Sequence, residues 1–537
     1  MNKKKKTTIM KKKTIITALI AMTLSVQSYP QSPNPTPTTR QATLANAHPL
    51  IPGYHPDPSI CRVGNEYYIV NSSFQYFPGV PVFKSSDMIH WEQIGNVLKR
   101  NSQLPLKGAS SWLGIYAPTL RYHDGTFYMI TTNVGNGGNF MVTASNPEGP
   151  WSEPIWLQQQ GIDPSLYFEN GKCYMMSNPD NTITLCEIDP TTGKQLTESR
   201  GIWRGTGGRY PEGPHIYKKG DYYYLLISEG GTEIAHSLTI ARSRDIYGPY
   251  ESCPRNPIFT HCCMAAQDSQ VQGTGHGDLV EDANGQWWMT FLAFRIYNGA
   301  YHHLGRETFL VPVEWDNEGW PVVNHGKPLQ PVTKETNFAV LPQAAIANSA
   351  AKGFKAMGPE WVYIQNPDSS KYELHGNTLR LHGSRSTLTE NEQPTFIGRR
   401  QQHADMTVSV TLDASQLKPG DEAGLTAYQI NDGHCEVLVG KSADGKFYAT
   451  VRYRMKNLEK TEEKVWLDSA RQTLVLRATP DNYEFLFGKD EKSLQKLGTI
   501  APQLMSTEVV GGFTGVVLGI YVTGTGSADF KSFDYRH

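Results

Sequence analysis

Five short segments of similar pattern recur in the N-terminal part of the chain, and this repeat limits the possible folds more than any other feature. In each segment a turn with glycine or asparagine precedes a strand-like run with an aromatic residue: Asn65-Glu66-Tyr67-Tyr68, Gly125-Thr126-Phe127-Tyr128, Gly171-Lys172-Cys173-Tyr174, Gly220-Asp221-Tyr222-Tyr223 and Gly285-Gln286-Trp287-Trp288. Aligned on their aromatic residues, the segments follow one another at intervals of 60, 46, 49 and 64 residues. Repeats of this length are typical of four-stranded blades. The sequence therefore predicts an all-β fold in which residues 47–335 form a five-bladed β-propeller.

The same alignment brings together five positions, each 11 residues before the aligned aromatic residue: Asp57, Ala117, Asp163, Glu212 and His276. The innermost strand of each blade lines the central channel, so equivalent positions form a ring around the axis. Blade packing does not require acids there, and three close carboxylates repel one another. Any one of these acids alone would be typical of a turn. Their coincidence across the repeats favours an active site.

A second domain is predicted for residues 336–537. The stretch near Gly326–Ser349 has little pattern and indicates a domain connection. After it, short alternating runs return at Leu379-Arg380-Leu381, Thr407–Leu412, Phe447–Tyr453 and Thr473–Ala478. Such runs, spread over about 180 residues, favour a β-sandwich, here of jelly-roll type.

The first 28 residues have the pattern of a signal peptide. The charged segment Lys3–Lys13 precedes the short, mostly apolar run Ile15–Val26, which is too short to be a good transmembrane segment. Residues 29–46, rich in Pro, Thr and Gln, are expected to form a flexible leader. We therefore expect export across the inner membrane and a periplasmic location, with no transmembrane segment.

Charge excludes one class of partner. The chain has a net charge of −1. Without the seven lysines of the signal segment, 43 basic and 51 acidic residues remain, a net charge of −8. An acidic mature chain does not favour nucleic-acid binding.

The seven cysteines fit no zinc-binding spacing. Most of them are expected to be small buried hydrophobic residues, and the Cys262–Cys263 pair is the candidate for a disulfide to another cysteine.

The acidic ring matches the needs of glycoside hydrolysis, which uses one protonated and one ionised carboxyl group. A third acid nearby raises the pKa of the proton donor through like-charge repulsion. Aromatic neighbours that could stack on sugar rings are Phe74, Tyr76, Trp112 and Tyr116. Two other classes stay open at this point: a carbohydrate-binding propeller without catalysis, and a structural surface protein whose acids hold calcium.

The motifs also resemble a known family. The segments His55-Pro56-Asp57-Pro58-Ser59, Gly161-Ile162-Asp163-Pro164-Ser165 and Pro211-Glu212-Gly213-Pro214-His215, followed by Gly305-Arg306-Glu307-Thr308, are similar to glycoside hydrolase family 43 over residues 48–335. The remainder, with Trp361 and Leu379-Arg380-Leu381-His382-Gly383, resembles the β-sandwich attached to many bacterial β-xylosidases and α-L-arabinofuranosidases of that family.

This resemblance implies roles for single residues. Asp57 matches the general base, Glu212 the general acid, and Asp163 the residue that orients the acid and tunes its pKa. Arg295 resembles an arginine that contacts the substrate, and His276 matches an axial histidine that holds a structural calcium in some relatives. Phe74, Trp112, Tyr116, Arg295 and His276 are the expected substrate-binding residues. Tyr116 stands where many relatives have tryptophan before Ala-Pro.

The resemblance implies an inverting hydrolase that requires no cofactor, with a possible structural calcium, and has plant hemicellulose oligosaccharides as partners. A ring at one end of the propeller axis, partly covered by the second domain, favours a short pocket and therefore exo action. We expect it to release α-L-arabinofuranosyl units from the non-reducing ends of xyloglucan or arabinoxylan fragments. The alternative is a β-D-xylosidase that acts on xylo-oligosaccharides.

Overall fold

A computed structural model of the chain describes residues 48–263, 269–329 and 353–537. The predicted signal peptide (1–28), the leader (29–46) and the predicted domain boundary at 335/336 lie outside these residues. In the described ranges, no helix is long and apolar enough to cross a membrane.

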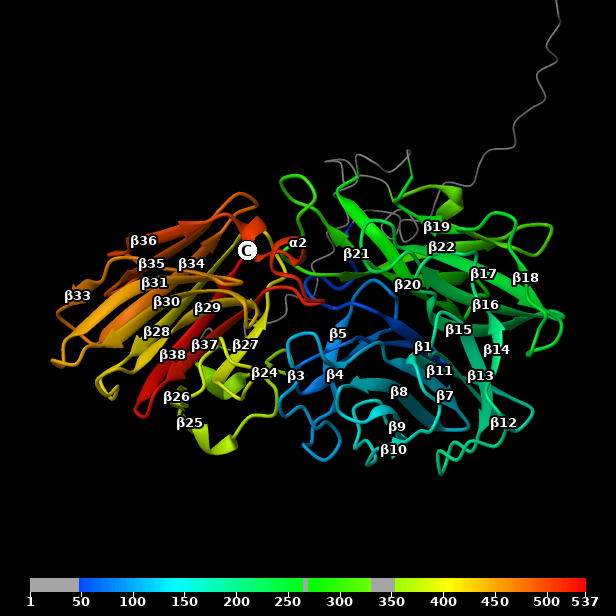
Figure 1. The fold of residues 1–537 in the computed structure, drawn as a ribbon, viewed down its shortest axis with the longest axis horizontal. Coiled ribbons are helices and arrows are strands. Elements are labelled where there is room, and N and C mark those ends of the chain that lie inside the picture. The colour runs from blue at the N-terminus through cyan, green and yellow to red at the C-terminus, as the bar shows by residue number, and fades with distance from the viewer. Residues whose placement is uncertain (1–47, 264–268, 330–352) are drawn as a thin grey trace, which may run out of the picture. The chain divides into compact units, whose positions relative to one another are not determined.

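Across residues 48–263 and 269–329 the chain forms five antiparallel sheets, which are the blades of the predicted propeller (Figure 1). Blade 1 contains β1 (Ser59–Val63), β2 (Glu66–Val70), β4 (Gly79–Ser85) and β5 (Glu92–Leu98). Blade 2 contains β7 (Thr119–His123), β8 (Thr126–Val134), β9 (Gly138–Ala144) and β10 (Ile155–Trp156), with β6 (Gly114–Ile115) also paired to β8. Blade 3 contains β11 (Ile162–Glu169), β12 (Lys172–Asn178), β13 (Ile183–Ile188) and β14 (Arg200–Trp203). Blade 4 contains β15 (Glu212–Lys219), β16 (Tyr222–Glu229), β17 (Ser237–Ser243), β18 (Glu251–Ser252) and β19 (Phe259–Thr260). Blade 5 contains β20 (Val271–Glu281), β21 (Trp287–Arg295), β22 (Glu307–Trp315) and β23 (Pro321–Val323), after which the 3-10 helix η2 (Asn324–Gly326) follows.

The repeated turns of the sequence join the first and second strands of each blade. Gly125, Gly171, Gly220 and Gly285 stand in these turns with positive φ, which glycine adopts without steric cost. The inner strands β1, β7, β11, β15 and β20 each contact the next, and β20 contacts β1, so the ring of blades closes. The prediction of five blades is confirmed.

A buried carboxylate joins four blades at the axis. Asp278 of β20 accepts hydrogen bonds from the Ser59 hydroxyl (2.7 Å), the Arg121 guanidinium (2.8 and 3.1 Å) and the Tyr217 hydroxyl (2.5 Å). Burial alone would raise the pKa of Asp278, but the Arg121 charge and these hydrogen bonds hold it well below its usual value. The ionised carboxylate thus connects blades 1, 2, 4 and 5 below the ring of acids.

Residues 353–537 form the predicted β-sandwich of two antiparallel sheets. In order across the first sheet, the strands are β25 (Tyr372–His375), β26 (Thr378–His382), β38 (Ser527–Arg536), β28 (Met406–Asp413), β34 (Arg471–Ala478), β35 (Tyr483–Gly488) and β36 (Gln495–Ile500). The second sheet runs β27 (Thr395–Arg400), β37 (Val517–Thr523), β29 (Glu422–Ile430), β30 (Gly433–Lys441), β31 (Phe447–Met455) and β32 (Leu458–Thr461), with β33 (Val465–Leu467) also on β31. Short helices lie at η4 (Phe354–Ala356), η5 (Ser369–Lys371), η6 (Pro502–Met505) and α2 (Thr507–Val510).

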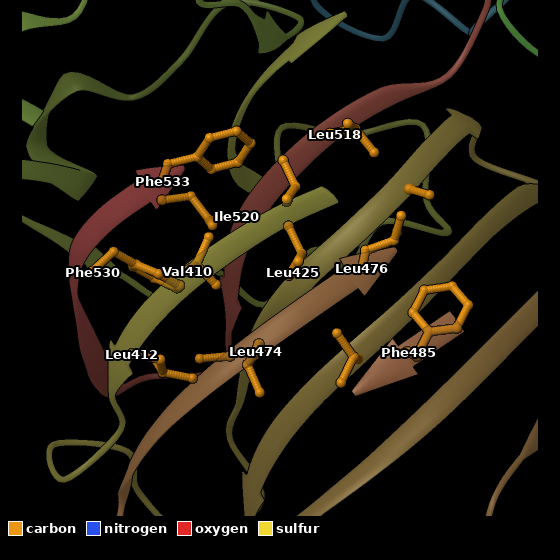
Figure 2. Close-up of a cluster of buried hydrophobic side chains, with 14 of the residues drawn as sticks. Val410, Leu412, Leu425, Leu474, Leu476, Phe485, Leu518, Ile520, Phe530 and Phe533 are labelled. Atoms are coloured by element: carbon orange, nitrogen blue, oxygen red, sulfur yellow. The ribbon is translucent and has the colours of Figure 1, made fainter. Parts of the chain in front are cut away.

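The sandwich core follows from strict alternation along its strands. Every second residue from Met406 to Leu412 in β28 and from Leu474 to Ala478 in β34 is apolar and buried. Figure 2 shows side chains of these strands, such as Leu412 and Leu474, facing those of the second sheet, such as Leu518. The interior between the sheets is therefore apolar, as in other sandwiches.

Propeller and sandwich are joined by backbone pairing. The strand β3 (Tyr76–Phe77), between β2 and β4, pairs with β24 (Tyr363–Ile364) after the propeller.

All seven cysteines lie in the described residues and are free, five of them buried, with Cys262 and Cys263 exposed. The expectation of mostly buried cysteines is confirmed, and the Cys262–Cys263 pair forms no disulfide in this structure.

Candidate active site

A cavity of about 410 Å³ opens at one end of the propeller axis. All five positions of the aligned ring line it, together with aromatic and polar side chains from loops of both domains. The lining residues are Asp57, Phe74, Trp112, Tyr116, Ala117, Ile162, Asp163, Tyr210, Glu212, Gly231, Thr232, Glu233, His276, Arg306 and Phe513. Its volume is within the range of small-molecule sites.

Backbone irregularities turn the ring side chains into this cavity. Asp57, Asp163 and His276 have φ of 52°, 53° and 45°, a left-handed conformation that is unfavourable for residues other than glycine. In blade 4 the left-handed residue is Gly213, where a Cβ would lie 2.9 Å from the His276 ring. The pairing of β11, β15 and β20 with their neighbours shifts register at these points. Such bulges re-aim side chains and are common beside active sites.

Asp57 is a buried carboxylate with a cationic partner. Arg306 donates a hydrogen bond to its Oδ1 (3.0 Å), Ser72 donates to its Oδ2 (2.5 Å), and the His276 Nδ1 lies 3.9 Å away. Burial would raise the pKa of Asp57, but the Arg306 and His276 interactions and the Ser72 hydrogen bond hold it below its usual value. Asp57 is therefore ionised near neutral pH.

Asp163 has the opposite electrostatic environment. Its carboxyl group, that of Glu212 and a ring nitrogen of His276 lie within 4.8 Å of one another. Burial, followed by the charges of Glu212 and Asp57, raises the pKa of Asp163 well above its usual range. The raised pKa favours the protonated form of Asp163 beside Glu212. Asp163 is buried and accepts from the Gly213 backbone N–H (3.2 Å), whereas Glu212 is part-exposed to the cavity.

The aromatic wall comes from both domains. Phe513, in the sandwich loop before β37, stacks on Phe74 with ring centroids 5.8 Å apart and meets Trp112 edge-on at 5.2 Å. The Arg306 guanidinium donates to the Phe513 carbonyl (3.1 Å), which ties this loop to the propeller. Trp112 is 40% exposed and stands at the mouth. The cavity thus has a charged floor and an apolar side, a combination that suits a sugar ring.

Comparison with known proteins matches both halves of this architecture. The family model "Glycosyl hydrolases family 43" matches residues 46–321, and "Beta xylosidase C-terminal Concanavalin A-like domain" matches residues 353–536. The chain is 42% identical over 514 residues to the non-reducing end alpha-L-arabinofuranosidase BoGH43B of Bacteroides ovatus, covering 92% of this chain and 95% of that protein. The chain belongs to glycosyl hydrolase family 43. It is a glycosidase with a carbohydrate substrate.

Further proteins similar to this family 43 hydrolase include two that are named as xylosidases. A xylosidase/arabinosidase of Butyrivibrio fibrisolvens is 39% identical over 92% of this chain and 98% of its own. The solved structure of the Bacteroides ovatus xyloglucan PUL GH43B superposes with a TM-score of 0.83 at 40% identity, covering 91% of this chain and 99% of that chain. The xylan beta-1,4-xylosidase of Bacillus halodurans C-125 gives 0.83 at 32% identity, over 92% of this chain and 100% of that chain.

One predicted substrate-binding residue of the hydrolase lies elsewhere. Arg295, at the end of β21, does not line the cavity. Its Nε and Nη2 donate to both oxygens of the buried Glu307 (2.7 and 2.8 Å). A guanidinium engaged in two such bonds to a buried carboxylate is not available to a sugar. The expectation for Arg295 is therefore wrong, and Arg306 occupies the place beside Asp57.

The structure brings together the other predicted residues except Tyr76, which is fully buried and does not line the cavity, and it adds some that the sequence did not indicate. Asp57, Asp163, Glu212, His276, Phe74, Trp112 and Tyr116 all line the cavity. Arg306 lies in the family-like motif Gly305-Arg306-Glu307-Thr308, but the resemblance implied no role for it. His236, a buried residue whose Nε2 lies 3.6 Å from Glu212 Oε1, and Phe513 lie outside the repeated segments. Proximity to a motif could have indicated Arg306, whereas no sequence signal indicated the other two.

The donors around His276 do not fit a calcium ion bound directly. Among the described residues, the groups that could share a metal there are one imidazole nitrogen and the carboxyls of Asp163 and Glu212. Calcium takes six to eight oxygen ligands, whereas this set offers two carboxyl groups, and the raised pKa of Asp163 opposes its ionisation. The His276 ring also packs against Gly213, which limits the space beside it. We derive no catalytic step through a metal, and a structural calcium at His276 stays a prediction.

Proposed function

We propose that the protein is an exo-acting, inverting α-L-arabinofuranosidase that removes single units from the non-reducing ends of plant hemicellulose oligosaccharides, such as xyloglucan or arabinoxylan fragments. The observation that carries this proposal is that one cavity brings together an ionised acid, Asp57, and an acid pair, Asp163 and Glu212, in which the pKa of Asp163 is raised. The 42% identity to a non-reducing end alpha-L-arabinofuranosidase supports the choice of sugar.

In the proposed reaction Asp57 is the general base. It accepts a proton from a water molecule as the water oxygen bonds to the anomeric carbon. The Arg306 guanidinium and the Ser72 hydroxyl keep Asp57 ionised and fix its orientation before the substrate arrives.

Glu212 is the general acid. It is the member of the acid pair that faces the cavity, so it donates the proton to the glycosidic oxygen as the bond to the anomeric carbon breaks. The buried Asp163 keeps that proton on the pair through like-charge repulsion, which is the tuning role that the family resemblance implies.

Exo action is supported by the shape of the site. The cavity is closed at its side by Phe513 from the sandwich, which packs against Phe74 and Trp112. A short, walled cavity admits the end of a chain and excludes its middle. The scissile bond then lies near Glu212, and the leaving part of the substrate extends past Tyr210 and Trp112 to solvent.

The second candidate is β-D-xylosidase activity, which the relatives named xylosidase/arabinosidase and xylan beta-1,4-xylosidase favour. Turnover of 4-nitrophenyl α-L-arabinofuranoside against 4-nitrophenyl β-D-xyloside by the purified protein decides between them. Preference for the xyloside would overturn the arabinofuranosidase assignment.

Proton NMR of the first-formed sugar tests the roles of the acids. We expect the inverted anomer, because Asp57 activates water and does not attack the sugar. Retention of configuration would contradict the base role. The variant Asp57→Ala should lose turnover and keep sugar binding, whereas a propeller that only binds carbohydrate would show no turnover in either form.

Export is proposed on the signal-peptide pattern of residues 1–28. N-terminal sequencing of the protein from a periplasmic fraction should begin just after Ser28, and an intact N-terminus would contradict it.

A further inference from the structure

A second, smaller cavity lies between the propeller and the sandwich, separate from the active site. It is lined by His55, Gln93, Glu360, Arg399, Arg400 and Gln402. Its volume of about 10 Å³ leaves room for one small particle and none for a polyatomic ligand. Two adjacent arginines at the end of β27 supply most of its charge.

Arg400 is a buried cation whose hydrogen-bonding edge has no protein partner. Its side chain belongs to a residue that is 4% exposed, and neither Nε nor Nη2 has a hydrogen-bond acceptor among the described residues. The guanidinium lies against the Tyr54 ring, 5.2 Å from its centroid. A buried donor without an acceptor costs free energy and therefore needs an explanation.

In two other arginines of this protein, the Nε and Nη2 groups both donate hydrogen bonds to one carboxylate. Arg295 uses Nε and Nη2 for Glu307, and Arg380 uses Nε and Nη2 for Asp529 (2.7 and 3.0 Å). These two nitrogens point their N–H groups the same way, so together they bind one anion. In Arg400 the Nε and Nη2 edge is buried, but no carboxylate of the described residues accepts a hydrogen bond from it.

The charges around the cavity do not balance. Glu360 stabilises the charge of Arg399. The ionisable neighbours of Arg400 are the phenols of Tyr54 and Tyr76, which carry no charge at neutral pH. Burial and the nearby Arg400 charge lower the pKa of His55 well below its usual value, so its ring is neutral too. One buried positive charge therefore stays uncompensated, and a water molecule could satisfy the N–H groups but not the charge.

We propose that this cavity is a binding site for a single monoatomic anion, chloride, held by the Nε and Nη2 edge of Arg400 with Arg399 Nε as a further donor. The small volume favours a halide over phosphate, sulfate or a carboxylate ligand. Because Gln93 and His55 come from the propeller and Arg400 from the sandwich, the bound ion stabilises the contact between the two domains.

Bromide in place of chloride tests the site directly in the unmodified protein. Crystals soaked in sodium bromide should give an anomalous peak within hydrogen-bonding distance of Arg400 Nε and Nη2. Density there without anomalous signal, which is the result expected for water or a protein side chain, would overturn the proposal.

Thermal unfolding gives a second measurement. When chloride replaces isethionate, an anion too large for the cavity, at constant ionic strength, the melting midpoint should rise and then saturate. At ten times its Kd, chloride shifts the folding equilibrium about tenfold, a rise of about 2–4 °C for a domain of this size. The variant Arg400→Met should lose this response, and the control Arg380→Met should keep it. Equal midpoints of the native protein in both salts would contradict the proposal even if Arg400→Met fails to fold.

Discussion

Replacing Arg306 with glutamine should shift the acid limb of the pH profile without removing any carboxyl group. Arg306 donates a 3.0 Å hydrogen bond to Asp57, and both side chains are only 7% exposed. A hydrogen bond to a buried charge contributes about 1.5–3 kcal/mol. Since one pKa unit corresponds to about 1.36 kcal/mol, the substitution should raise the pKa of Asp57 by about 1–2 units.

The direction of the change follows from the role of Asp57. The base must be ionised, so activity is lost as the pH falls through its pKa. In the native enzyme Arg306 holds this pKa below its usual value. In Arg306→Gln burial dominates, and the loss of kcat/KM on the acid side should begin about 1–2 pH units higher. Initial rates on 4-nitrophenyl α-L-arabinofuranoside between about pH 3 and 9, stopped with base before reading, measure it.

The matched control is Arg295→Gln. It removes another buried arginine that binds a carboxylate, but the partner is Glu307, outside the cavity. This variant should melt at a lower temperature, because breaking a buried ion pair costs about 3–5 kcal/mol, and it should keep the native pH profile while folded. An unchanged acid limb in Arg306→Gln, or a shift of the same size in Arg295→Gln, would refute the assignment.

Three further outcomes are expected. Glu212→Gln should lower kcat/KM by about 10²–10⁴-fold on oligosaccharides and much less on activated aryl glycosides, whose leaving groups need little protonation; equal losses on both would remove the acid role. Phe513→Ala should lower kcat/KM about tenfold, mainly through KM, because about 1–2 kcal/mol of aromatic contact is lost, and an unchanged KM would show that this wall does not contact the sugar. Activity should survive EDTA treatment, assayed beside a calcium-replete sample, since no proposed step uses a metal; loss that calcium restores while the melting temperature is unchanged would contradict this.

Repetition is what made the acidic ring predictable. Asp57, Asp163 and Glu212 are far apart in the chain, but each stands at the same offset from a repeated turn, and blade symmetry converts equal offsets into one ring. The backbone kinks at these positions, such as φ of 53° at Asp163, leave no sequence signal, because left-handed aspartate is uncommon but not excluded.

Features outside the repeat could not be found in this way. Phe513 comes from the other domain, and its place in the cavity depends on how the sandwich loop docks through Arg306. His236 lies just before β17, in a connection between strands where nothing in the sequence constrains its direction. Domain docking and loop direction are set by tertiary contacts, which a single sequence without repeats does not encode in a readable pattern.

The sequence could in principle have shown that Arg306, and not Arg295, lies in the active site. Arg306 directly precedes Glu307, the first residue of β22, and successive side chains of extended backbone point to opposite faces. Glu307 points away from the cavity and pairs with Arg295 across the β21–β22 hairpin, where Ala293 is its register partner. Arg306 must then point toward the cavity. Glu307 follows Arg306 in sequence and can reach Arg295 across the hairpin. Once the register of the hairpin is known, the pairing of Glu307 with Arg295 therefore identifies Arg306 as the arginine available to the active site.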